Sequence, residues 1–223
     1  NTRATLLANA PTQSNFMTIS PRDRHVIFFG TQTTPGSTST VDPMSVLFGS
    51  QESITDFTPN ATNTAGFQRL SSGNRIVTAI PTRGDILILT NTSAHSMQFV
   101  GPPFTFSFKQ IGTNCGTLST HSAVEAENVV YWMSDGAFYL FDGVVKEIPC
   151  SVQDYVFQDL NEDEHSIIYA GVNLDFAEVN WFYASGTSTA ISSSAASIAT
   201  SATSSSASAP ADLTSEITPS SAT

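Results

Sequence analysis

Histidine is the side chain best suited to metal binding and to acid–base chemistry near neutral pH. The chain has four histidines, which fall on different predicted elements: His25, His95, His121 and His165. None has a second histidine or a cysteine at the spacing of a zinc motif. A metal site would therefore need the fold to gather them. We expect surface or hydrogen-bonded core histidines and no metal.

No nucleophile motif is recognisable in the sequence, which contains no GxSxG, P-loop or GxGxxG pattern. Cys115 lies in Gly112-Thr113-Asn114-Cys115-Gly116 without an evident base, and the flanking glycines are typical of a tight bend.

The carboxylates give no clear catalytic pair either. Glu125 and Glu127 lie two apart on a predicted strand and are expected on one face, while Asp135 and Asp142 are turn residues. The acidic run 162–164 lacks the alternating spacing of a calcium loop. These observations predict a protein that is not an enzyme and that uses no cofactor.

The segment Gly101-Pro102-Pro103-Phe104 is the most distinctive candidate site. Its two prolines end a strand, and alternate phenylalanines on the next strand would place three rings on one face. One interpretation is an interface between subunits or a stacking surface for a ligand; the other is a strand that faces the core. The residues concerned are Pro102, Pro103, Phe104, Phe106 and Phe108.

Residues 1–185 read as β structure with explicit turns. Asp-Gly pairs, which supply the positive φ of a tight turn, join the run 129–133 to 137–141 and that run to 144–148. The stretch 82–85 joins a further hairpin between 76–80 and 86–89. The remaining runs rich in β-branched and aromatic residues are 26–29, 97–100, 167–171 and 179–183.

This pattern predicts an all-β fold of antiparallel meanders, propeller-like or a sandwich, in one domain over residues 1–185. A short helix is expected near 151–160, capped by Ser151, with Val152, Tyr155, Val156 and Leu160 on one face. Residues 186–223 are rich in Ser, Ala and Thr and predict a linker, a tail or a poorly assigned segment.

The charge balance argues against ordinary nucleic-acid binding. The chain carries 8 basic against 19 acidic residues, a net charge of -11, and every Lys and Arg lies at or before Lys146. Such a surface suits a wall past which DNA slides, and equally a face kept acidic for solubility. Cys115 and Cys150 could form one disulfide or remain buried thiols, and the lack of an export signal favours thiols.

No apolar run approaches the length of a membrane helix, and no signal peptide opens the chain. The chain begins with Asn1 in place of Met, and we expect it to be part of a longer protein.

The ordered run of several segments resembles bacteriophage tail proteins of the nozzle or tail-hub kind. The resemblance covers about residues 10–185 and is carried by structural motifs such as Met97-Gln98-Phe99-Val100-Gly101-Pro102-Pro103-Phe104, Val130-Tyr131-Trp132-Met133 and Glu178-Val179-Asn180-Trp181-Phe182-Tyr183. Members of this family are expected to continue with further strands where the Ser, Ala and Thr stretch begins here.

The resemblance implies a virion structural protein in a ring, expected to be a hexamer, around the channel for DNA ejection. Its implied partners are further copies of the chain, the adaptor and portal and other tail proteins; genomic DNA would pass without specific binding. The alternatives are a peripheral tail protein that binds a host receptor or glycan, with Trp132, Tyr139 and Trp181 as stacking platforms, and a propeller-type hydrolase.

Overall fold

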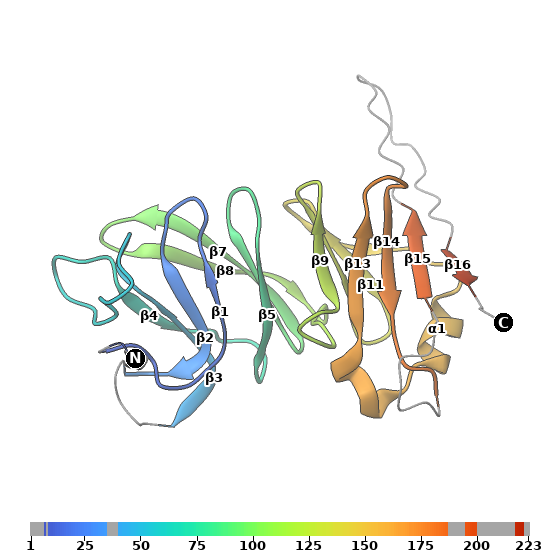
Figure 1. Ribbon diagram of the computed structural model, residues 1–223, viewed down its shortest axis with the longest axis horizontal. Helices are drawn as coiled ribbons and strands as arrows, with labels where there is room; N and C mark the ends of the chain where they lie inside the picture. Colours follow the sequence, from blue (N-terminus) through green and yellow to red (C-terminus); the bar gives the residue numbers. More distant parts are fainter. Residues whose placement is uncertain (1–6, 8, 35–39, 187–194, 200–216, 221–223) are drawn as a thin grey trace, which may run out of the picture. The chain divides into compact units, whose positions relative to one another are not determined.

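The computed structural model describes residues 7, 9–34, 40–186, 195–199 and 217–220, the last two segments through their backbone alone. The chain divides into two compact units, residues 1–114 and 115–223. Each unit contains two four-stranded antiparallel sheets (Figure 1). The predicted all-β class is confirmed.

Unit 1 holds the first two sheets. Sheet 1 contains β1 (Ser14–Ile19), β2 (Val26–Gln32), β3 (Val41–Phe48) and β4 (Gly66–Arg69). Sheet 2 contains β5 (Ile76–Pro81), β6 (Ile86–Thr90), β7 (Ser93–Gly101) and β8 (Thr105–Thr113). In both sheets neighbours in sequence are neighbours in space, so each sheet is an up-and-down meander.

Unit 2 repeats the arrangement. Sheet 3 contains β9 (Ala123–Ala126), β10 (Val129–Met133), β11 (Phe138–Phe141) and β12 (Val145–Ile148). The helix α1 (Gln153–Asp159) and the 3-10 helix η1 (Glu162–Ile167) follow. Sheet 4 contains β13 (Tyr169–Asn173), β14 (Glu178–Phe182), β15 (Ala195–Ala199) and β16 (Ile217–Ser220).

Each unit has its own hydrophobic core. In unit 1, Ile27 and Phe29 of β2 and Val46 of β3 pack with Ile88 of β6 and Phe106 of β8. All five residues of β6 are buried, as its unbroken apolar run indicates. The sequence predicted one β-rich domain over 1–185. The pattern of strands and turns does not indicate which sheets share a core, so it does not reveal two separate cores.

The core of unit 2 lies between sheets 3 and 4 and is closed by the helix. Trp181 of β14 packs against Phe138 of β11 with ring centroids 5.1 Å apart, and Val156 of α1 belongs to the same cluster. Burial of these apolar surfaces is the main force that holds the sheets together.

The predicted hairpins are present. The Thr82 amide donates to the Asp85 carbonyl at 2.8 Å where β5 turns into β6. Gly136 and Gly143 have φ of +83° and +112° at the turns on either side of β11, which explains why the sequence places glycine there.

The helix agrees with the prediction in place but not in its cap. Val152 occupies the N-cap position and makes no capping hydrogen bond, so the prediction for Ser151 is wrong. Val156 and Leu160 are buried, whereas Tyr155 is 61% exposed. The predicted segment 186–223 lies mostly outside the described residues; its described parts are Gly186 and the backbones of β15 and β16.

Within each unit, the first strands of the two sheets approach one another: β1 lies near β5, and β9 lies beside β13 (Figure 1). Four-stranded meanders packed in this way resemble neighbouring blades of a propeller. Two antiparallel sheets that enclose a core between them also fit the other predicted arrangement, a small sandwich, in which the sheets pack face to face.

Candidate functional site

The segment 101–108 forms the tip of the β7–β8 hairpin and the start of β8. Gly101 pairs with Thr105 across the tip, and the peptide bond between Pro102 and Pro103 is cis. Phe104 belongs to this turn and is 78% exposed. Three phenylalanine rings therefore do not share one strand face, because the strand begins only at Thr105.

The other two phenylalanines of this segment face the core. Phe106 is buried and lies edge-on to Phe48, with centroids 4.9 Å apart. Phe108 is half-buried against the same ring at 6.5 Å. The core-facing interpretation therefore fits Phe106 and Phe108, while Pro102, Pro103 and Phe104 remain at the surface.

A buried histidine lies beside this cluster. His25 is fully buried, and its ring centroid lies 5.0 Å from Phe106 and 5.6 Å from Phe99. Its Nε2 is 3.2 Å from the Thr64 hydroxyl, while Nδ1 has no hydrogen-bond partner. Burial lowers the pKa of His25, although the nearby Asp23 backbone acts in the opposite direction. The neutral ring is thus a packing element.

A serine and a histidine also meet inside unit 1. The Ser93 Oγ lies 3.0 Å from His95 Nε2, and both side chains are buried. This Ser-x-His pair on one strand face was not singled out in the sequence. Ser93 donates to the Ser72 carbonyl at 2.9 Å, and burial lowers the pKa of His95. These hydrogen bonds attach the loop around Ser72 to sheet 2, which is a structural role.

Three carboxylates of sheet 3, those of Glu127, Asp135 and Asp142, occupy turns, whereas Glu125 lies in β9. Glu127 and Asn128 have φ of +51° and +69°, which makes them the central residues of the β9–β10 hairpin, and Glu125 accepts the Asn128 amide at 2.7 Å. The expectation that Glu125 and Glu127 share a strand face is therefore wrong. Asp142 accepts a 2.6 Å hydrogen bond from Lys146, which holds its pKa below the ordinary value.

The described part of the chain contains no group of three or more His, Cys, Asp or Glu that could hold a metal ion. The acidic run 162–164 lies in η1, where the Asn161 side chain accepts the Asp163 amide at 3.0 Å. Cys115 and Cys150 keep their thiols, the first buried and the second half-buried.

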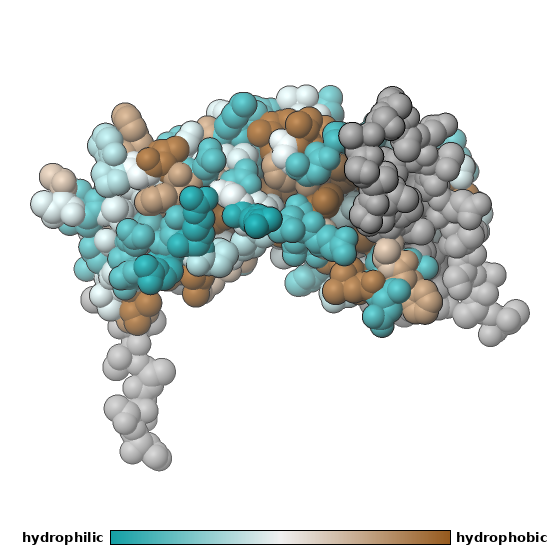
Figure 2. All heavy atoms as spheres, turned by 90° about the horizontal axis from the view of Figure 1, so that it is seen from above, coloured by the Kyte–Doolittle hydropathy of each residue, from teal (hydrophilic) through white to brown (hydrophobic). Residues whose placement is uncertain are grey.

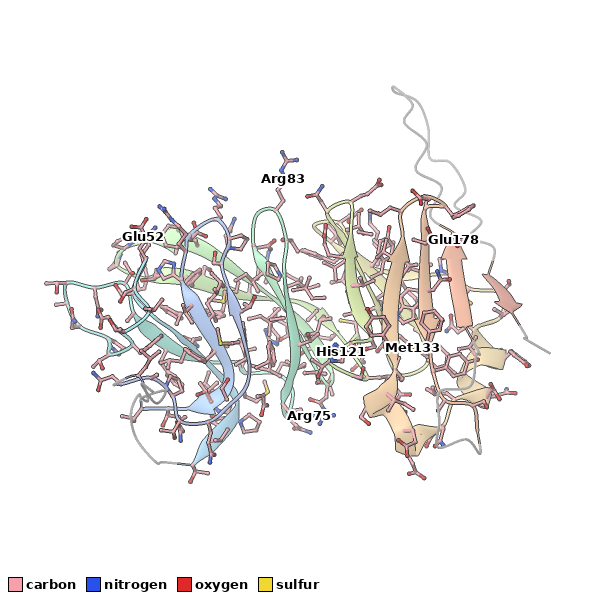
Figure 3. The ribbon with its side chains drawn as sticks, viewed as in Figure 1. Glu52, Arg75, Arg83, His121, Met133 and Glu178 are labelled. Atoms are coloured by element: carbon pink, nitrogen blue, oxygen red, sulfur yellow. The ribbon has the colours of Figure 1, made fainter. Side chains whose placement is uncertain are left out.

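One pocket lies in unit 1 between the β1–β2 and β5–β6 turns, with Arg22, Asp23, Arg83 and Asp85 at its rim. It has room for about one water molecule, far less than the several hundred Å³ of a typical ligand site. Arg83 points away from the turn that carries it (Figure 3).

The tryptophans proposed as glycan platforms are structural. Trp132 and Trp181 are both fully buried, and each indole N–H donates to a backbone carbonyl at 2.9 Å, of Cys115 and Ser122 respectively. Tyr139 stacks on Trp132 with centroids 5.7 Å apart. The exposed aromatic side chains of unit 2 are different residues: Tyr155, Tyr169, Phe176 and, to a smaller extent, Phe182.

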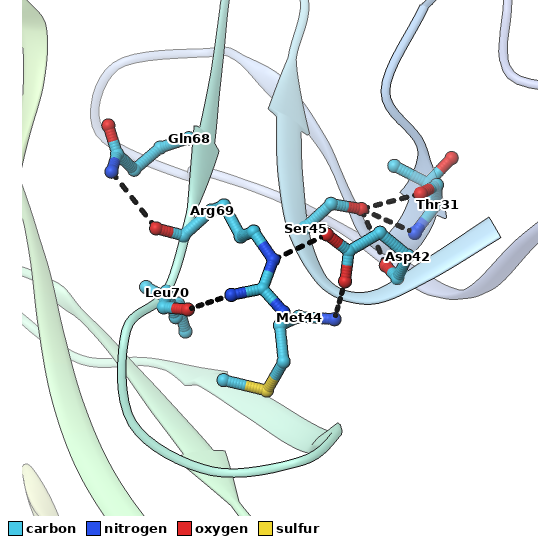
Figure 4. A network of polar contacts seen from close by, with 7 residues as sticks. All are labelled: Thr31, Asp42, Met44, Ser45, Gln68, Arg69 and Leu70. Atoms are coloured by element: carbon cyan, nitrogen blue, oxygen red, sulfur yellow. Dashed lines mark hydrogen bonds and ion pairs between the residues drawn. The ribbon is translucent and has the colours of Figure 1, made fainter.

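Charge is divided unequally between the two units. Unit 1 carries seven Lys and Arg against five Asp and Glu, whereas unit 2 carries one against fourteen. Part of the unit 1 charge is neutralised locally: Arg69 Nε donates to Asp42 at 2.7 Å beside the Ser45–Thr31 hydrogen bonds that fasten β3 to β2 (Figure 4). Unit 2 is thus a strongly acidic body.

The surface is otherwise mixed. Figure 2 shows apolar residues in several separate patches among polar ones on the face in view. In the described ranges, no helix is long and apolar enough to cross a membrane.

Comparison with known proteins adds no assignment. No protein-family model matches the chain, and no curated protein matches its sequence.

Proposed function

We propose that the chain is a structural component of a bacteriophage tail that forms part of a nozzle or hub ring around the DNA ejection channel. The observation that carries the proposal is the succession of four up-and-down meanders, two in each unit, packed like propeller blades. A wall built of such sheets needs neither a cofactor nor a catalytic pair.

The charge of unit 2 supports the same role. With fourteen acidic residues and one basic residue, this unit repels phosphate and offers little to which a passing genome would adhere. The side chains of unit 1 that could act as an acid, a base or a nucleophile are His25 and the Ser93–His95 pair. They are buried, and they serve packing and the attachment of a loop.

Electron cryomicroscopy of the assembled particle tests this proposal. We expect density for this chain in a symmetric ring on the tail axis, with unit 2 acidic surface lining or bordering the lumen. A position off the axis, or a lumen with neutral or positive potential, contradicts the channel role. Absence of the chain from the particle contradicts the proposal as a whole.

A second candidate is a peripheral tail protein that binds a glycan. The specific observation in its favour is the exposed aromatic pair Tyr169 and Phe182 on one face of sheet 4. Binding of the protein to host surface polysaccharide, lost on replacement of both rings by serine, supports this candidate over the first.

A further inference from the structure

Two hairpin turns of sheet 3 carry the same dipeptide. Asp135-Gly136 lies between β10 and β11, and Asp142-Gly143 lies between β11 and β12. All four residues are exposed. Both glycines have positive φ, +83° at Gly136 and +112° at Gly143. The two sites therefore share their sequence, their access to solvent and the kind of backbone that follows the aspartate.

An aspartate followed by glycine can rearrange without an enzyme. The backbone nitrogen of the glycine attacks the side-chain Cγ of the aspartate, a C–N bond forms, and the hydroxyl of the neutral carboxyl leaves as water with the amide proton. Water then opens the cyclic imide at either carbonyl, which gives aspartate again or isoaspartate, in which the main chain runs through the side-chain carbonyl. Glycine favours this reaction because it has no Cβ to shield its nitrogen.

The attacking nitrogens of the two sites are equally available. In the part of the chain that the structure describes, neither the Gly136 amide nor the Gly143 amide donates a hydrogen bond. The first turn is closed on its other side, where the Ser134 amide donates to the Ala137 carbonyl at 2.8 Å. A difference in reactivity is therefore expected from the carboxyl groups.

The two carboxyl groups differ in their contacts. Asp142 Oδ2 accepts a 2.6 Å hydrogen bond from Lys146 Nζ, and Asp142 Oδ1 accepts the Val144 amide at 3.3 Å. Among the described residues, the Asp135 carboxylate has neither a hydrogen bond nor an ion pair. Both contacts hold the Asp142 carboxylate in place, and both favour its charged form.

The charged form of the carboxyl is the unreactive one. A carboxylate repels the incoming nitrogen and cannot release its oxygen as water, so the reaction proceeds through the neutral carboxyl. The hydrogen bond from Lys146 lowers the pKa of Asp142 and so reduces the fraction of neutral carboxyl at neutral pH. Lys146 is the only Lys or Arg in unit 2, so this unit has no second Lys or Arg to protect Asp135.

We propose that Asp135 is the site at which this protein forms isoaspartate on ageing, and that Lys146 protects the second Asp-Gly pair at Asp142. The modification needs no ligand, partner or co-reactant other than water. It goes beyond the proposed function and does not depend on it. Ageing of the purified chain therefore succeeds or fails whatever the place of the chain in a phage particle.

Isomerisation at Asp135 acts on helix α1. The Gly136 carbonyl accepts a 2.6 Å hydrogen bond from the Gln153 side chain of α1, and Val156 of the same helix lies in the core of unit 2. Isoaspartate adds a methylene group to the backbone of the β10–β11 turn and displaces this carbonyl. The aged turn therefore loses a contact that holds the start of α1 in place.

Ageing in water enriched in heavy oxygen tests the proposal on the full chain. Each imide that opens takes up one heavy oxygen atom, and chymotryptic peptides separate the two sites because Phe138, Tyr139 and Phe141 lie between them. Mass spectrometry then gives the label at each site, and chromatography separates the isoaspartate peptide from its aspartate form. After weeks at neutral pH, the label at Asp135 should exceed that at Asp142 by roughly threefold or more, since each pKa unit changes the neutral fraction about tenfold.

Two variants and an unfolded control separate the contributions. Lys146→Met should raise the label at Asp142 by roughly threefold or more and leave that at Asp135 unchanged. Asp135→Glu should remove the label at its own site, because glutamate would have to form a larger ring, which closes more slowly. In urea the two Asp-Gly sites should label at similar rates, because the folded contacts of Asp142 are lost. Equal labelling in the folded protein, faster labelling at Asp142 or no label at Asp135 overturns the inference, as does a Lys146 variant that labels like the wild type.

The effect on α1 has its own measurement. Aged wild-type protein should melt at a lower temperature than fresh protein, whereas the Asp135→Glu variant should melt at the same temperature before and after ageing. The matched control Asp142→Glu should lose stability on ageing as the wild type does. A melting temperature that stays constant while isoaspartate accumulates at Asp135 contradicts the loosening of α1.

Discussion

The histidine side chains that could act in acid–base chemistry include two that are buried, His25 and His95, and these contribute to packing and to internal hydrogen bonds. His25 is the clearest case, because its ring is enclosed by Phe99 and Phe106 and its Nδ1 has no hydrogen-bond partner. Burial opposes protonation of this ring and outweighs the effect of Asp23, which favours the charged form.

This burial predicts a pH dependence of stability. The pKa of His25 is lowered in the folded state from the ordinary 6.5, mainly by burial, so the unfolded state binds more protons below pH 6.5. The contribution of the neutral His25 ring to the free energy of unfolding is complete above pH 6.5. It is lost as the pH falls toward the lower pKa of His25 in the folded state. His95 has the same sign. Urea unfolding across this range should show a decreasing free energy of unfolding as the pH falls.

His25→Phe should flatten this pH dependence by removing the main titrating group of the cage, and the part due to His95 should remain. An unchanged slope in the His25 variant would refute the assignment.

The buried indoles predict a second residue-scale effect. Trp181→Phe removes the donor to the Ser122 carbonyl and part of a fully buried side chain, so it should lower the free energy of unfolding by about 1–3 kcal/mol. Phe176→Leu, at a side chain 71% exposed, should change it by less than about 0.5 kcal/mol. Urea titration measures both; equal losses would contradict the placement of Trp181.

At the scale of elements, the hairpin turns decide which glycines matter. Gly143 has φ of +112°, a backbone conformation that disfavours any side chain, although no atom lies within 4 Å of an added Cβ. Gly84, in the β5–β6 turn, has the same open space and no such constraint.

The two positions therefore form a matched pair. Gly143→Ala should destabilise the protein by about 1–2 kcal/mol through backbone strain alone. Gly84→Ala should be neutral or stabilising by up to about 1 kcal/mol, because alanine restricts the unfolded chain. Thermal unfolding followed by circular dichroism distinguishes them. Similar effects at both positions would show that the turn at Gly143 relaxes.

At the scale of the whole molecule, two separate cores predict that unit 1 folds alone. Residues 1–114 contain two complete meanders and the full cluster around Ile27, Phe29 and Ile88. The fragment should show a cooperative thermal transition, and Ile88→Ala should lower its stability by about 2–5 kcal/mol. A fragment without a cooperative transition would show that unit 1 depends on the rest of the chain.

The charge division also belongs to this scale. Neither unit alone has the net charge of -11, because unit 1 is slightly basic and unit 2 strongly acidic.

The sequence by itself determined the class of the fold and most of the strands and turns. Alternation of apolar residues and Asp-Gly pairs are local signals, and the meander 129–148 follows from them almost residue by residue. The same signals located the helix, but they misjudged its cap, because the helix starts one residue later than expected and Val152 occupies the N-cap position.

Only the tertiary structure decided which side chains are available for function. Trp132 and Phe106 could have been surface platforms by type and spacing, but both are buried: Phe106 packs against Phe48 of sheet 1, and the Trp132 indole donates to the Cys115 carbonyl. Tyr169 and Phe182, by contrast, are 53% and 36% exposed in the folded chain. Exposure depends on contacts between residues far apart in sequence, and a local pattern contains no record of those contacts.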